Sequence, residues 1–337
     1  MESLLPPVSA PTRVGILHLQ RFWKRTALKR SGQLPQDAFI EEWATDQSMM
    51  NALGIGLEPT ISYLYQEAPD FETFENWILE KTGGVNAEVI REFNRMLEGQ
   101  AAKSETEGTG KILTEEDTRF FSEHGYLIVR NAVTDAESQA AQDAVWEFLG
   151  YDPRNPGSWY KIHPERKGIM VQLFHHPALE KTRRSEKIRR IFAELFGHDK
   201  LFVTTDRVSF NPPENDRWTF PGPNLHWDVS IKQPIPFALQ GLLYLTDTRA
   251  DQGAFTLVPG FQHSIGEWLE KLPEGINPRT AILGTPDAKP LAANRGDFIV
   301  WHQALPHGSR PNTSDFPRIV QYITWQEIDQ PKQEDWL

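Results

Sequence analysis

The sequence contains no cysteine. Disulfides, thiolate metal sites, iron–sulfur clusters and cysteine nucleophiles are therefore excluded. Any transition metal in this protein must be bound through nitrogen and oxygen, so the 10 histidines and the 46 acidic residues become the candidate ligands.

Long apolar runs are also missing. No stretch approaches the roughly 18 uninterrupted apolar residues of a membrane-spanning helix, and the N-terminus has no basic start leading into an apolar run. We therefore expect a cytoplasmic protein with neither a membrane segment nor a secretory signal. Basic residues are fewer than acidic ones, 35 against 46, and the net charge of −11 argues against broad attraction to nucleic acid or anionic membranes.

The first part of the chain, residues 1–110, is predicted to be a mostly helical N-terminal extension. Its clearest helix begins after Asn86, a good N-cap, and ends at Gly99. The stretch from Gly99 to Gly110 is polar and punctuated by glycine, which is typical of a linker. The domain boundary is therefore expected near Lys111.

Residues 111–337 are predicted to form one α+β domain. Helices are expected from the capping pair Thr114 and Asp117 to Gly125, over Asp135–Leu149 and over Ser185–Phe196, with a strand over Tyr126–Arg130. Short strands separated by Pro, Gly and Asn turns are then expected at Leu201–Phe210, Leu225–Val229, Ala238–Leu245, Ala254–Val258, Phe298–His302 and Ile319–Gln326. This spacing predicts an antiparallel sandwich or jelly roll, cupin-like, with flanking helices.

The strongest chemical signal is His226-Trp227-Asp228, followed downstream by His307 and Arg318. Residues i and i+2 of a strand share a face, so His226 and Asp228 could bind one ion, and Trp227 would point away from it. Two imidazoles and one carboxylate form the facial triad of non-haem Fe(II) oxygenases. Arg318 could clamp the distal carboxylate of the co-substrate 2-oxoglutarate through two parallel hydrogen bonds.

The remaining histidines are weaker candidates for metal binding. His302 lies on the strand that approaches His307 and is a possible rival ligand, although the Gly-Ser after His307 favours the latter. His263 lies in a Pro-Gly turn, and His175 and His176 precede a proline. A structural or solvated role is the better interpretation for these three.

The ordered motifs resemble the phytanoyl-CoA dioxygenase family of Fe(II)- and 2-oxoglutarate-dependent oxygenases. That family carries His-x-Asp, then a distal His-Gly-Ser, an Asn, and an Arg at the spacing seen here, 318 − 307 = 11 positions. The resemblance extends from about Leu113 to Gln326. Further similar segments are Phe120–Arg130, Val208–Pro213, Gln252–Ser264 and Gly296–His302.

The resemblance implies the cofactors and the site residues. His226, Asp228 and His307 would ligate Fe(II), Arg318 would pair with the distal carboxylate of 2-oxoglutarate, and Ser309 would add a hydrogen bond beside it. Dioxygen is the third reactant, and succinate and CO2 are the co-products. The double-stranded β-helix, or jelly roll, is the fold that the resemblance implies.

The function expected is hydroxylation of an unactivated C–H bond in a small molecule or natural-product intermediate. Related halogenases lack the carboxylate, so Asp228 favours hydroxylation. Epimerisation, desaturation or cyclisation on the same iron centre stay open as alternatives. A non-enzymatic cupin-like metal-binding protein is a further alternative, but it has no need for a carboxylate clamp at Arg318. Oligomeric state cannot be read from the sequence.

Residues that would contact the substrate are less defined. By resemblance, Met170, Gln172 and Arg207 fall near positions that line the co-substrate or substrate pocket. Ordinary barrel packing and pocket lining are equally good interpretations of one predicted strand face, made of Gln240, Leu242 and Tyr244.

Charged residues outside the triad have a plainer interpretation. Lys161, His163 and Arg217 could meet an anionic substrate or be surface charges. A basic cluster could receive phosphates, but a solvated helix face is the better interpretation of its residues, Lys181, Arg183, Arg184, Lys187, Arg189 and Arg190.

Overall fold

The computed structural model describes residues 4–99, 110–327 and 336–337. Most of the expected linker, residues 100–109, lies outside the described residues. The described residues divide by their contacts into two compact units, the first of which contains residues 4–99. Residues 198–205 and 326–327 also belong to this first unit, while 110–197 and 206–325 form the second. Within the described ranges, no helix combines the length and apolar character needed to cross a membrane.

The first unit is helical. Asn86 caps its last helix as expected, because its side chain accepts hydrogen bonds from the backbone N–H groups of Glu88 and Val89. The helices pack around a core of buried side chains that includes Phe22, Met49 and Phe93. Its elements are α1 (Leu19–Arg30), η2 (Ile40–Glu42), α2 (Trp43–Leu53), α3 (Leu57–Gln66), α4 (Phe71–Thr82) and α5 (Ala87–Leu97).

A buried ion network lies inside the helical unit. His18 Nε2 is 2.9 Å from Asp46 Oδ1, Arg21 donates to Glu42 over 2.7 Å, and Arg25 donates to both carboxylates. His18, Glu42 and Asp46 have the spacing of a metal site. However, the two guanidinium charges balance the two carboxylates, so no net negative charge is left to attract a cation. The cluster is better explained as a structural network.

The second unit begins with helices and short strands. The helices start at the N-cap positions expected from the sequence. Thr114 with Asp117, and Thr134 with Glu137, each form a reciprocal capping box. Ser185 caps the third expected helix through the backbone N–H of Ile188. These elements are α6 (Glu115–His124), β1 (Tyr126–Val129), α7 (Asp135–Leu149), η3 (Pro156–Tyr160), β2 (Arg166–Lys167), β3 (Met170–Val171), α8 (Pro177–Arg183) and α9 (Glu186–Phe196).

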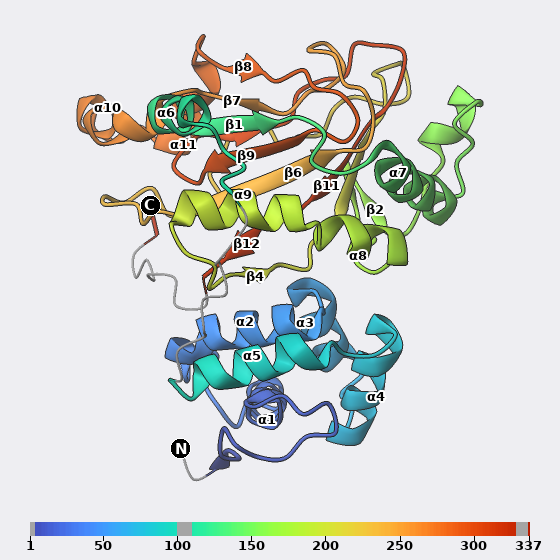
Figure 1. Ribbon diagram of the computed structural model, residues 1–337, viewed down its shortest axis with the longest axis vertical. Coiled ribbons are helices and arrows are strands. Elements are labelled where there is room, and N and C mark those ends of the chain that lie inside the picture. The colour runs from blue at the N-terminus through green and yellow to red at the C-terminus, as the bar shows by residue number, and fades with distance from the viewer. Residues whose placement is uncertain (1–3, 100–109, 328–335) are drawn as a thin grey trace. The chain divides into compact units, whose positions relative to one another are not determined.

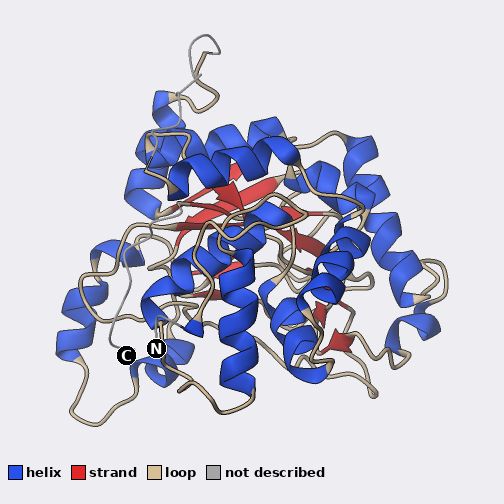
Figure 2. Ribbon diagram, turned by 90° about the horizontal axis from the view of Figure 1, so that it is seen from below, coloured by secondary structure: helices blue, strands red, loops and turns tan. Residues whose placement is uncertain are grey.

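Two antiparallel sheets form the centre of the second unit. One has the order β1-β9-β6-β11-β5-β3-β2, and the other has the order β10-β7-β8. The remaining elements are β5 (Val208–Asn211), β6 (Leu239–Tyr244), β7 (Thr256–Leu257), η4 (Phe261–His263), α10 (Ile265–Lys271), α11 (Pro278–Ala281), η5 (Ile282–Gly284), β8 (Lys289–Pro290), β9 (Phe298–His302), β10 (His307–Gly308) and β11 (Arg318–Tyr322). A two-stranded pair joins β4 (Phe202–Val203) to β12 (Trp325–Gln326). The mixed helix and strand content, visible in Figure 2, confirms the α+β prediction.

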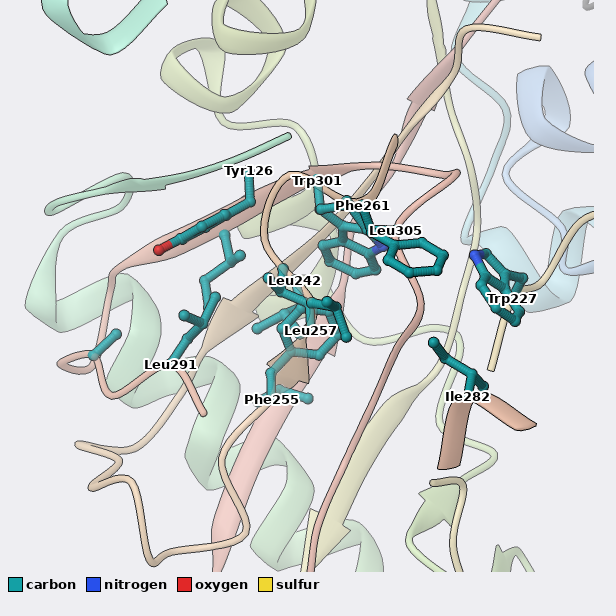
Figure 3. Packing of buried hydrophobic residues seen from close by; sticks show 14 of the residues in the cluster. Tyr126, Trp227, Leu242, Phe255, Leu257, Phe261, Ile282, Leu291, Trp301 and Leu305 are labelled. Carbon is teal, nitrogen blue, oxygen red and sulfur yellow. The ribbon is translucent and has the colours of Figure 1, made fainter. Parts of the chain in front are cut away.

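The main core lies between the two sheets. Leu242 of β6 and Trp301 of β9 share it with Leu257 of β7 and with Phe255, which precedes β7 (Figure 3). Helices α7, α8 and α9 lie against the opposite face of the large sheet (Figure 1). Side chains at the alternate strand positions point to that face. Three contacts join these helices to that face: Trp146 with Phe210, Leu179 with Gln321, and Phe192 with Phe298.

Two of the predicted strands are interrupted in the structure. The segment Leu201–Phe210 is divided into β4 and β5, which belong to different units. Between them, the Asp206 side chain accepts from the backbone N–H of Arg207, and the Asp206 carbonyl accepts from Arg183. These bonds take the place of ladder bonds. The segment Ile319–Gln326 is likewise divided into β11 and β12.

Gly241 of β6 offers a direct test of how closely the large sheet is packed. A Cβ there would clash with the ring of Phe298 and lie 2.6 Å from the carbonyl oxygen of Ile323. We expect Gly241→Ala to lower the free energy of unfolding by about 1–3 kcal/mol, measured by denaturant titration. Gly284→Ala is the matched control, since no atom lies within 4 Å of its added Cβ. Equal stability of the two variants would contradict this description of the sheet.

Candidate metal centre

Three side chains converge where the two sheets meet. His226 and His307 exchange backbone hydrogen bonds of 2.8 and 3.0 Å, which brings β10 against the segment that carries Asp228. The Nε2 atoms of His226 and His307 lie 3.3 and 3.2 Å from the two Asp228 carboxylate oxygens. Adjacent ligands at metal–ligand bonds of roughly 2.1 Å and right angles lie roughly 3 Å apart, so this spacing fits a single ion.

Hydrogen bonds select the tautomer of both histidines. The Nδ1 atom of His226 lies 2.7 Å from the carbonyl oxygen of Asn224, and Nδ1 of His307 lies 3.0 Å from that of Leu305. Because a carbonyl only accepts, each Nδ1 must carry the proton. In the neutral ring each Nε2 therefore carries the lone pair, which is the form that binds a metal. Without a metal, a protonated Nε2 can instead donate to the Asp228 carboxylate.

The prediction of a strand at Leu225–Val229 is wrong, although His226 and Asp228 still lie together as that prediction required. Only His226 makes a ladder pair, and the carbonyls of Trp227 and Val229 instead accept from the guanidinium of Arg279. Trp227 points away from the cluster, as expected, and donates from Nε1 to the carbonyl of Ala304. The i, i+2 spacing thus brings the two side chains together in a loop.

The protonation equilibria of the cluster follow from its geometry. Burial lowers the pKa of His226, but the hydrogen bond and charge of Asp228 outweigh burial, and its pKa is raised. Burial raises the pKa of Asp228, but hydrogen bonds from His226 and His307 hold that pKa far below its usual range. Asp228 is therefore a carboxylate throughout the ordinary pH range, and a cation is favoured beside it.

Gln240 also holds the Asp228 carboxylate, a contact that the sequence did not predict. Its Nε2 donates to Asp228 Oδ2 over 2.7 Å, and its Oε1 accepts from Trp301 Nε1 over 3.0 Å. An indole N–H only donates, so Trp301 orients the amide with its NH2 group toward Asp228. The strand face that was open to two interpretations is divided between them: Gln240 lines the cavity, whereas Leu242 and Tyr244 are buried core.

Arg318 is a buried cation at the start of β11, and it is not among the residues that line the cavity over the cluster. Its side chain has no exposed surface, it donates to Ser209 Oγ over 3.0 Å, and its Nε has no partner. No carboxylate among the described residues forms an ion pair with it. An unpaired buried charge is costly, so the position is suited to an anionic group supplied by a ligand.

A cavity of about 360 Å³ opens over the cluster. His226, Asp228, His307, Ser309 and Arg207 are among its lining residues. The other lining residues are Met170, Asp206, Pro223, Gln240, Gly241, Phe255, Trp301, Gly308, Tyr322 and Thr324. Its volume lies within the range typical of small-molecule sites, roughly 300–1,000 Å³.

Other candidate residues do not line this cavity. Gln172, Lys161, His163 and Arg217 are not among the lining residues. The predicted basic cluster is not a uniform solvated face, because Arg183 is 1% exposed and donates to the carbonyls of Phe174 and Asp206. Two further members of the cluster are engaged in the chain's own contacts: Lys187 with the carbonyls of Arg130 and Asn131, and Arg189 with Glu186.

His302 does not join the three converging side chains. Its ring meets Phe237 with centroids 5.3 Å apart, and its Nδ1 accepts from the backbone N–H of Ala304. Burial, with a smaller contribution from His263, lowers the pKa of His302 to about 4. The neutral ring is therefore part of the folded structure.

Comparison with known proteins identifies a family and several relatives of this chain. Residues 121–320 match the family described as phytanoyl-CoA dioxygenase. A Dictyostelium discoideum protein carrying that family's name is 23% identical over 255 residues, 60% of this chain and 73% of the relative. The 2-aminoethylphosphonate dioxygenase of an uncultured bacterium is 21% identical over 227 residues, 64% of this chain and 83% of that protein.

A solved structure shares the fold. The product of GlcNAc Inducible Gene 2 of Candida albicans aligns with a TM-score of 0.50 and 16% identity, covering 63% of each chain. The family match confirms the resemblance expected from the sequence motifs.

The pKa of His302 leads to a prediction about pH. A histidine that is held neutral in the folded state stabilises the fold fully above its unfolded pKa of about 6.5, and this stabilisation is lost as pH falls toward 4. His302→Asn preserves an acceptor and removes the titration. We expect the stability difference between wild type and variant to shrink by up to about 3 kcal/mol over this window, measured by urea unfolding. A difference that is constant with pH would contradict the assignment.

Proposed function

Because the chain belongs to the phytanoyl-CoA dioxygenase family, and so is an Fe(II)- and 2-oxoglutarate-dependent dioxygenase, we propose that it hydroxylates an unactivated C–H bond of a small molecule or natural-product intermediate. The observation that carries this proposal is the convergence of His226, Asp228 and His307, and the unpaired buried charge of Arg318 supports it. Succinate and CO2 are the expected co-products.

The iron ligands in this proposal are His226, Asp228 and His307. Their donor atoms all lie within 4.8 Å of one another, and both imidazoles have the tautomer that presents Nε2. This donor set occupies one side of an ion and leaves positions for ligands on the other. When bound, ferrous iron with 2-oxoglutarate and dioxygen supplies the C–H oxidation. The protein's own part is to orient the ligands and to enclose the reaction.

The distal carboxylate of 2-oxoglutarate is assigned to Arg318 and Ser309. Arg318 offers a planar guanidinium with an unused Nε, and Ser309 lines the cavity at 7% exposure. A carboxylate there would remove the unpaired buried charge. Arg207 lines the same cavity and is assigned to substrate or co-substrate contact; Gln172 stays a weaker candidate for it.

The proposed function also implies a fold for the catalytic domain. The two antiparallel sheets around the main core are assigned to a double-stranded β-helix, or jelly roll, that makes up the catalytic domain from residue 111 onward. Residues 1–110 are assigned to a helical N-terminal extension. The division of contacts supports this, since residues 4–99 and residues from 110 onward fall in different units, with 198–205 and 326–327 joining the first.

Hydroxylation is preferred to halogenation because Asp228 supplies the carboxylate ligand. The cavity of about 360 Å³ supports a small-molecule substrate. Analysis of the product formed alongside succinate would separate hydroxylation from epimerisation, desaturation or cyclisation.

The metal site predicts a spectroscopic result. Anaerobic addition of Fe(II) and 2-oxoglutarate to the wild-type protein should give a visible charge-transfer band, and oxygen should then yield succinate. His226→Ala should lose the band, because one of the converging donors is removed. His263→Ala is the control: His263 is exposed and donates to the Ser122 carbonyl. If the wild-type protein gives neither the charge-transfer band nor succinate, the proposed function is wrong.

The carboxylate clamp predicts a separate result for Arg318. A lysine at this position keeps the charge but cannot make two parallel hydrogen bonds. We expect Arg318→Lys to raise the KM for 2-oxoglutarate by roughly 10- to 100-fold, since the lost interaction is a buried charged one of about 1.5–3 kcal/mol. Fe(II) affinity in the absence of 2-oxoglutarate should stay close to wild type. An unchanged KM would assign the co-substrate to another residue.

A further inference from the structure

The segment that carries Asp228 makes few of the backbone hydrogen bonds that pair one strand with another. Of residues 226–229, only His226 takes part in a ladder pair. Arg279 NH1 donates to the carbonyl of Trp227 over 2.7 Å, and Arg279 NH2 donates to that of Val229 over 2.7 Å. One guanidinium therefore grips the carbonyls on both sides of Asp228.

The position of Arg279 is itself well defined. It lies in α11, where its backbone N–H donates to the Asn277 side chain, and α11 leads into Ile282, which is 1% exposed. The guanidinium carbon lies 5.0 Å from the ring centroid of Trp336, and the backbone oxygen of Leu337 accepts from NH2 over 2.8 Å. A side chain held on several sides loses little further freedom when it binds the two carbonyls.

Gln240 and Arg279 hold different parts of the same residue. Gln240 donates to the Asp228 carboxylate and so limits rotation of the side chain, whereas Arg279 holds the backbone on either side. Arg279 does not line the cavity, so its removal would not remove a substrate contact. The negative charge of Asp228 also acts on Arg279, offsetting part of the lowering of the Arg279 pKa by burial.

We infer that Arg279 is a positioning residue that holds the backbone around Asp228 so that its carboxylate meets His226 and His307 at metal-binding distance. The inference rests on the proposed function, in which Asp228 is a ligand. A guanidinium is suited to the task because its planar donors reach two carbonyls at once, whereas a lysine is a single point charge. Partners that orient ligands typically change metal affinity by about 10- to 100-fold when they are lost.

The test is Co(II) binding to the full chain, followed by calorimetry and by the visible absorption of bound Co(II). Arg279→Met should raise the Kd for Co(II) by about 10- to 100-fold and alter the absorption spectrum at saturation. Arg279→Lys should weaken binding less. Hydrogen exchange of the peptide containing residues 226–229 should be faster in both metal-free variants. Arg249→Met is the matched control, because Arg249 pairs with Asp251 and Asp315 on the surface, and it should leave all three readouts unchanged.

The outcomes separate this inference from the proposed function. If the wild-type protein binds no Co(II) and no Fe(II), the metal assignment fails, and the inference fails with it. If wild type binds Co(II) and Arg279→Met binds it with the same Kd, spectrum and exchange rates, only the inference is overturned. Should Arg279→Met fail to fold, a folded Arg279→Lys variant with wild-type Kd and spectrum would overturn it equally.

Discussion

The reciprocal backbone hydrogen bonds between His226 and His307 are the constraint on which the site depends. They join two segments 307 − 226 = 81 positions apart, so the imidazoles lie side by side and each approaches one carboxylate oxygen of Asp228. Gly308 permits this approach, because a Cβ on it would clash with the carbonyl of Asn224 and lie 3.0 Å from that of Pro223. A larger residue next to His307 would therefore push His307 away from His226 and Asp228.

The electrostatic arrangement complements the cofactors of the family. Asp228, held ionised by two imidazoles and an amide, presents negative charge where a cation belongs. Arg318 carries an unpaired positive charge, to which the proposed function assigns the distal carboxylate of 2-oxoglutarate. Burial makes the unmatched charge of Arg318 costly, whereas the Asp228 side chain is half exposed and faces two imidazoles. Under the proposed function, 2-oxoglutarate supplies the counterion that Arg318 lacks.

Prediction from sequence succeeded where the deciding contacts are local. The boxes at Thr114 and Thr134 and the caps at Asn86 and Ser185 involve residues within three positions, so the helices began where expected. Strand predictions failed where a distant side chain took the backbone hydrogen bonds. Arg279 did so within Leu225–Val229.

By itself, the sequence determined which atoms were available: no thiolate, a His-x-Asp pair, a distal histidine and an arginine 11 positions beyond it. It also determined the family. Tertiary structure alone decided the tautomers of His226 and His307, the hold of Gln240 and Arg279 on Asp228, and the lack of a counterion for Arg318. The physical reason is that each of these depends on groups from separate elements, whose meeting is decided by sheet pairing and core packing and leaves no local pattern in the chain.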